Sequence, residues 1–103
     1  MEDVLAAAAA WAADGDTTAV ATVVETWGSS PRPAGSRLAI SASGRMAGSV
    51  SGGCVEGAVA DAAQAVFQTG VPQVLDYGIT NERAWEVGLA CGGKLTVFLE
   101  RIG

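Results

Sequence analysis

Residues 17–26 read TTAVATVVET, and this stretch decides the fold. Threonine and valine are β-branched residues that favour extended backbone, so the run predicts a strand. Its apolar side chains fall on both faces of that strand rather than on alternate residues. A strand that is apolar on both faces is buried on both faces, which predicts a central strand in a sheet covered by helices.

The flanking segments predict two helices. The alanine-rich stretch 2–13 predicts a helix that ends at Gly15 in a left-handed conformation. Residues 54–69 predict a second helix, because apolar side chains recur there at helical spacing, and Gly70 ends it. The buried stripe expected on the first helix comprises Val4, Leu5, Ala8, Trp11 and Ala12. The stripe expected on the second comprises Val55, Val59, Ala62, Ala63 and Val66.

Four further strands complete the predicted sheet. Segments 37–41 and 45–50 form a hairpin that turns at Gly44, and two more strands occupy 72–78 and 94–101. Residues 27–36 are expected to form a loop, and residues 80–87 a helical turn capped by Thr80 or Asn81. The chain therefore predicts a single compact α/β domain over residues 1–103, with an α+β arrangement as the alternative. We expect a mixed sheet of about five strands with two main helices packed on it.

Composition excludes several classes of function. The net charge is −5, which is unfavourable for nucleic-acid binding because phosphate contacts need a basic face. The chain has no histidine, which excludes His-based catalysis and zinc sites that need imidazole. The N-terminal segment lacks the basic region of a signal peptide, and no apolar run approaches the ~20 residues of a membrane span. We therefore expect a cytoplasmic protein with reduced thiols. Half of the residues are hydrophobic, which favours a homo-oligomer or a partner-bound state.

The decamer GSVSGGCVEG at 48–57 joins a predicted strand to the second predicted helix. Glycines before a helix N-terminus leave backbone N–H groups available to an anion. The positive end of the helix would favour the thiolate form of Cys54, whereas Glu56 would oppose it. Glu56 has an alternative role at the third position of a capping box whose N-cap is Gly53. The alternative for the whole motif is a tight turn beside a packed cysteine.

The hexamer GLACGG at 88–93 places the other cysteine, Cys91, before a turn into the last predicted strand. Gly92 and Gly93 permit positive φ and close approach of a ligand to the backbone. Two cysteines beside glycine pairs at strand ends predict a shared pocket. The alternative is two turns beside small buried side chains, and a disulfide would require the fold to join the two thiols.

Arginines gather around the predicted loop. The stretch WGSSPRPAGSR at 27–37 contains Ser30, Arg32 and Arg37, and Arg45 follows shortly after. Guanidinium groups in a proline-stiffened loop suit a phosphate or a carboxylate, with a solvated loop as the alternative. Thiols, a helix N-terminus and arginines together fit a ligand that carries both a soft metal or sulfur centre and a phosphate.

Three stretches of the chain resemble the XdhC/CoxI family. They are ATVVETWGSSPRPAGSRLAIS, GSVSGGCVEGAV and AWEVGLACGGKLTVFLE, in this order. The resemblance implies the family's N-terminal domain, without the C-terminal Rossmann domain of many members and without NAD. It implies an accessory factor rather than an enzyme, one that binds molybdenum cofactor (molybdopterin) transiently. Such a factor assists sulfuration of the cofactor and its insertion into hydroxylases of the xanthine dehydrogenase or carbon monoxide dehydrogenase type.

The resemblance also assigns residues and partners. The implied contacts to molybdenum or sulfur are Cys54 and Cys91, which are also the candidate sulfur carriers; zinc is not expected. The implied partners are an apo molybdenum hydroxylase, a cysteine desulfurase and a separate Rossmann-domain chain. The alternatives are a persulfide-carrying thiol protein and an oligomeric interaction domain without a ligand. The candidate cofactor-binding residues are Ser30, Arg32, Arg37, Ser51, Gly52, Gly53, Cys54, Glu56, Cys91, Gly92 and Gly93.

Overall fold

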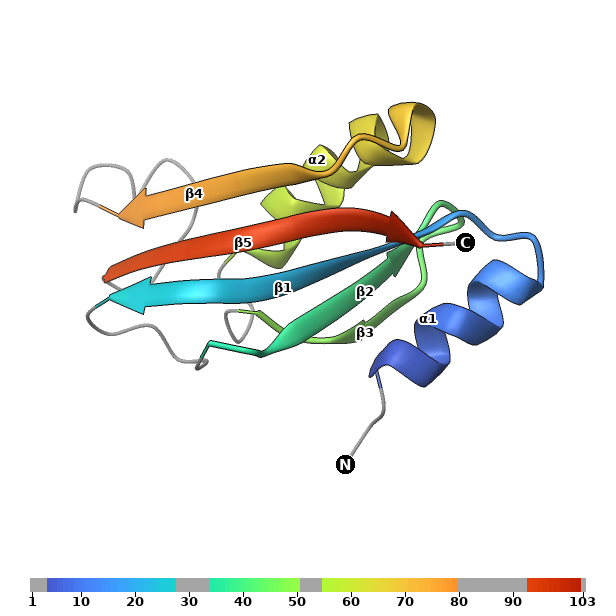
Figure 1. Cartoon of the computed structure of the whole chain (residues 1–103), viewed down its shortest axis with the longest axis horizontal. Helices are drawn as coiled ribbons and strands as arrows, with labels where there is room; N and C mark the ends of the chain where they lie inside the picture. The colour runs from blue at the N-terminus through green and yellow to red at the C-terminus, as the bar shows by residue number, and fades with distance from the viewer. Residues whose placement is uncertain (1–3, 28–33, 51–54, 80–92, 103) are drawn as a thin grey trace.

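A five-stranded sheet with a helix on each face forms the protein (Figure 1). The computed structural model describes residues 4–27, 34–50, 55–79 and 93–102. The helices are α1 (Val4–Ala13) and α2 (Glu56–Thr69). The strands are β1 (Thr18–Trp27), β2 (Arg37–Ser41), β3 (Met46–Gly48), β4 (Gln73–Ile79) and β5 (Gly93–Ile102). The predicted α/β class with five strands and two helices is confirmed.

The strand order is β3-β2-β1-β5-β4, so β1 lies at the centre as its sequence predicts. Every strand pair in the described part of the chain is antiparallel, whereas the sequence predicts a mixed sheet. The reason lies in the connections. Among the described residues, α2 is the one helix between two strands, and it links β3 to β4 at opposite edges of the sheet, so these two strands do not pair. A parallel pair needs a crossover between neighbouring strands, and α2 does not provide one.

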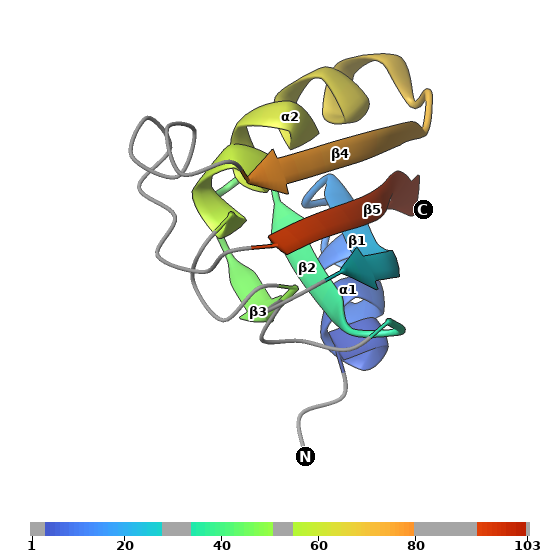
Figure 2. The ribbon, with the colours of Figure 1, turned by 90° about the vertical axis from the view of Figure 1, so that its left-hand side faces the viewer.

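The first half of β1 is buried on both faces, each under a different helix, whereas Val24 further along is 52% exposed (Figure 2). Ala19, Ala21 and Val23 face the larger core, which α2 covers. Val20 faces the opposite way, into a smaller core with Ala8 of α1. Burial on alternate sides explains why consecutive residues from Ala19 to Ala21 are all apolar.

The buried side of α1 is rotated slightly from the prediction. Val4, Ala8 and Trp11 contact the smaller core as expected, and Ala7 contributes as well. Leu5, which was predicted to lie on the buried stripe, is 45% exposed. A helix made almost entirely of alanine has little contrast between its faces, so periodicity alone orients it poorly.

Helix α2 follows its predicted stripe but begins later than expected. Val59 and Val66 are fully buried, and the left-handed Gly70 ends the helix with a φ of 70°. The prediction placed the first residue at 54, whereas the helix starts at Glu56. The backbone N–H of Val59 donates to the carbonyl of Val55 at 2.9 Å, which makes Val55 the N-cap. The predicted capping box with Gly53 as N-cap is therefore wrong.

Two predicted turns are confirmed by their backbone angles. Gly15 after α1 has a φ of 84°, and Gly44 between β2 and β3 has a φ of 99°. The predicted helical turn at 80–87 lies outside the described residues. Within the part of the chain that the structure describes, no helix is long and apolar enough to cross a membrane.

Candidate functional site

Most residues of the predicted site lie outside the described part of the chain. The described ones are Arg37 at the start of β2, Glu56 at the start of α2, and the backbone of Gly93 at the start of β5. The others are Ser30, Arg32, Ser51, Gly52, Gly53, Cys54, Cys91 and Gly92. The described residues on either side of these segments still determine where the chain enters and leaves each one.

The strand register brings the ends of three strands together. Trp27, the last residue of β1, pairs with Lys94 of β5. Ile79, the last residue of β4, pairs with Gly93. The chain therefore leaves β1 and β4, and enters β5, at one end of the sheet (Figure 1). We call this end, defined by Trp27, Ile79 and Gly93, the loop end.

The hairpin of β2 and β3 opens toward the same end but stops short of it, because Arg37 at the start of β2 pairs with Thr22 of β1 rather than with Trp27. Gly48, the last residue of β3, pairs with Leu38 near the start of β2. The carbonyl of Arg37 accepts a hydrogen bond from the backbone N–H of Ser49 at 3.0 Å. Arg37 is exposed, and its backbone lies beside Ser49, which precedes the segment with Cys54 in the chain. The segments that carry Ser30 and Cys91 therefore begin or end at the loop end, whereas the segment with Cys54 follows β3, a strand that runs toward this end.

Glu56 connects the two sides of the segment that carries Cys54. Its Oε2 accepts a hydrogen bond from the Ser49 hydroxyl at 2.7 Å and another from the Val50 backbone N–H at 3.0 Å. A carboxylate in the first turn of a helix also interacts favourably with the helix dipole. The side chain therefore reaches back from α2 to the residues that follow β3.

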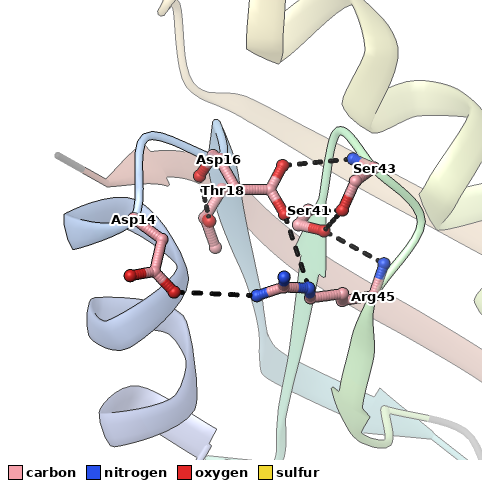
Figure 3. Close-up of polar contacts among 6 residues, drawn as sticks. All are labelled: Asp14, Asp16, Thr18, Ser41, Ser43 and Arg45. Carbon is pink, nitrogen blue, oxygen red and sulfur yellow. Dashed lines mark hydrogen bonds and ion pairs between the residues drawn. The ribbon is translucent and has the colours of Figure 1, made fainter.

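Arg45 lies at the opposite end of the sheet (Figure 3). Its Nε lies 3.8 Å from Asp16 Oδ2, and one terminal nitrogen lies 4.0 Å from Asp14 Oδ2. Arg37 and Arg45 are close in sequence, but β2 separates them, because Arg37 begins this strand and Arg45 follows the turn after it. Arg45 therefore does not contribute to the loop end.

A polar network joins the β2–β3 turn to the segment before β1 (Figure 3). Asp16 accepts hydrogen bonds from the hydroxyl of Ser43 at 2.6 Å and from its backbone N–H at 3.2 Å. The Ser43 side chain is the main reason that the pKa of Asp16 is lowered from its ordinary value. The hydroxyl of Ser41 accepts from the Arg45 backbone N–H at 3.0 Å. No residue pattern in the sequence predicts this network, although the short polar stretches DGD at 14–16 and SASG at 41–44 contain most of its residues.

A hollow of about 270 Å³ also lies at this opposite end. It contains none of the predicted site residues. Arg101 lines it and donates to the carbonyl of Phe67 at 3.1 Å, in the last turn of α2. A cation beside the C-terminus of a helix is stabilising, which explains this arginine structurally. The complete lining is Ala12, Gly15, Asp16, Thr17, Arg101 and Ile102.

Comparison with known proteins identifies the family. Residues 11–78 match the model of the XdhC and CoxI family. The chain belongs to this family. The match covers α2, the first three strands, nearly all of β4 and the first cysteine, so the family that the first two motifs indicate is confirmed, while the third motif lies beyond the matched residues.

Two curated proteins are similar to this XdhC and CoxI family chain. It is 34% identical over 88 residues to the molybdenum cofactor insertion chaperone PaoD of Escherichia coli (strain K12), covering 85% of this chain and 27% of that protein. It is 33% identical over 91 residues to a probable xanthine dehydrogenase component of Bacillus subtilis (strain 168), covering 86% of this chain and 28% of that protein. The chain thus spans less than a third of the length of either relative.

The fold of this family chain is also found in a solved structure. A crystal structure described as a xanthine dehydrogenase from Bacillus halodurans superposes with a TM-score of 0.82 at 28% sequence identity. The superposition covers 99% of this chain and 31% of that one. The sheet and both helices therefore correspond to one part of a larger relative.

Proposed function

We propose that this chain binds molybdenum cofactor and acts as a maturation factor for molybdenum hydroxylases. Its similarity to a protein named as a molybdenum cofactor insertion chaperone supports this proposal. The strand register supports it as well, because the segment with Cys91 joins β4 to β5 at the loop end and the segment with Cys54 follows β3, which runs toward that end. This shared direction of the two segments is the structural observation on which the proposal depends.

The individual steps that we propose for this chain are those that its resemblance to the family implies. The chain receives the cofactor in the cytoplasm, assists its sulfuration with a cysteine desulfurase, and delivers it to an apo-hydroxylase of the xanthine dehydrogenase or carbon monoxide dehydrogenase type. It acts as an accessory factor rather than an enzyme. A second copy or a separate Rossmann-domain chain completes the assembly.

The chemistry of the donors fits this cofactor. Molybdenum cofactor is a pterin that holds the metal through a dithiolene and ends in a phosphate. Cysteine sulfur is a soft ligand suited to molybdenum or to transferred sulfur, which assigns Cys54 and Cys91 to that part of the cofactor. The exposed Arg37 beside the β3–α2 connection, together with Arg32, suits the phosphate. The glycines Gly52, Gly53, Gly92 and Gly93, with Ser30 and Ser51, supply backbone and hydroxyl contacts.

Binding of molybdenum cofactor by the purified chain tests the proposal. We expect about one equivalent per chain, and a loss of affinity of about tenfold or more in Cys54→Ala or Cys91→Ala, since a metal or sulfur contact typically contributes this much. Arg37→Ala should weaken binding in a salt-dependent way. Ser43→Ala, at the opposite end of the sheet, is the control and should bind as the parent does. Unchanged binding in both cysteine variants would refute the assignment of the site.

A further inference from the structure

The carboxylate of Glu56 joins residues that precede Cys54 in the chain to the start of the helix that follows it. One oxygen, Oε2, accepts both the Ser49 hydroxyl at 2.7 Å and the Val50 backbone N–H at 3.0 Å. These two donors precede the segment 51–54, whereas Glu56 follows it at the start of α2. The hydrogen bonds therefore join the end of β3 to the first turn of α2, across the residues that include the cysteine.

The residues next to this connection are fixed in the core. Val50 is fully buried, and Val55 is 2% exposed in the same apolar cluster. Only four residues, 51–54, separate these two anchors. Without Glu56, the N–H of the buried Val50 would lose this acceptor, and a buried donor without a partner is costly. The carboxylate therefore helps to hold the residues after β3 beside the start of α2.

We propose that Glu56 is a positioning residue that holds the Cys54 segment through its hydrogen bonds to Ser49 and Val50, rather than a residue that contacts the cofactor. The proposal deepens the function above and rests on it for the role of Cys54. In this proposal the side chain acts because its oxygen accepts hydrogen bonds from Ser49 and Val50, and not because it is negatively charged. A glutamine at position 56 keeps an acceptor oxygen and should preserve it, whereas alanine should not.

Alkylation of the Cys54 thiol tests the proposal in a Cys91→Ser background, where intact mass reports one thiol. Iodoacetamide should modify Cys54 about fivefold faster in Glu56→Ala, the factor by which losing one hydrogen bond shifts a local opening equilibrium. Ser49→Ala should give a smaller increase. Glu56→Gln should stay within about twofold of the parent, because its amide oxygen accepts both donors. The matched control is Asp61→Ala, which removes an exposed carboxylate from the same helix.

Two outcomes would overturn the proposal. One is an alkylation rate in both Glu56→Ala and Ser49→Ala that equals the rate in Asp61→Ala. The other is a Glu56→Gln variant that reacts as fast as Glu56→Ala, since the charge would then be responsible. Circular dichroism verifies folding, and Ser49→Ala decides the question if Glu56→Ala does not fold.

The inference and the proposed function fail separately. If Cys54→Ala binds molybdenum cofactor like the parent, the proposed role of Cys54 fails, whereas the alkylation rates still measure the effect of Glu56. If Cys54→Ala loses the cofactor while Glu56→Ala changes neither alkylation nor binding, the positioning role fails and the proposed function stands.

Discussion

Replacing Gly48 with alanine should destabilise the protein far more than the same change at Gly44. Both glycines have positive φ, 87° at Gly48 and 99° at Gly44. A methyl group at Gly44 would meet no atom within 4 Å. At Gly48 it would collide with the backbone carbonyl oxygen of Arg37 and lie 2.6 Å from Cγ2 of Val4. Backbone strain is therefore common to the two variants, and the collision is specific to Gly48.

The magnitudes follow from these two terms. Strain at positive φ costs about 1–2 kcal/mol for an alanine, which is the whole effect expected at Gly44. Forcing a methyl group into a packed site costs about 1–3 kcal/mol more. The carbonyl of Arg37 cannot move freely, because it accepts the N–H of Ser49 at 3.0 Å. We expect a total loss of about 2–5 kcal/mol for Gly48→Ala.

Thermal unfolding of the two variants measures the difference. Each kcal/mol lowers Tm by roughly 4–8 °C in a domain of this size. Gly48→Ala should therefore have a Tm at least about 8 °C below that of Gly44→Ala, for a difference of about 2 kcal/mol. Equal Tm values would refute the reasoning, because they would mean that β3 moves away from β2 without a cost.

Three further results are expected. Burial, together with the nearby Asp61, raises the pKa of Tyr77 above 10.0, so ultraviolet titration of this single tyrosine should show a raised midpoint that Asp61→Asn lowers. Because folding favours the neutral phenol, its contribution to stability is lost as pH rises through that raised pKa, and an ordinary midpoint would contradict this. The pKa of Asp16 is lowered, so its contribution is present above the ordinary aspartate pKa and lost as pH falls through the lowered one. Acid unfolding of Asp16→Asn should therefore depend less on pH than that of the parent, and an identical dependence would contradict the prediction. In urea unfolding, Leu99→Ala should cost about 2–5 kcal/mol and the exposed Leu5→Ala less than about 0.5 kcal/mol, whereas similar losses would be inconsistent with their burial.

The elements of this fold are predictable because local patterns specify them. Alternation of apolar with other residues predicts β5 as a strand, and its Leu95, Val97 and Leu99 are buried. The apolar run of β1 predicts its central position in the sheet. Glycine at a position that needs positive φ, as at Gly44, marks a turn without reference to the rest of the chain. These signals involve only neighbouring residues.

The candidate site was only partly predictable for the same reason. The pairing of β1 and β4 with β5 joins residues far apart in the chain, and no local pattern specifies which strand lies beside which. The three arginines near the predicted loop illustrate this limit, because Arg37 lies toward the loop end whereas Arg45 pairs with Asp14 and Asp16 at the other end.

The sequence alone determined the order of helices and strands, the two-sided burial of β1 and the family of the protein. These properties depend on short-range spacing and on motifs that can be read residue by residue. The tertiary structure alone decided the antiparallel pairing, the rotation of α1 and the connection from Glu56 to Ser49. Each of these depends on a contact between segments that only the folded chain brings together, where burial and hydrogen bonding select one arrangement among several that the sequence permits.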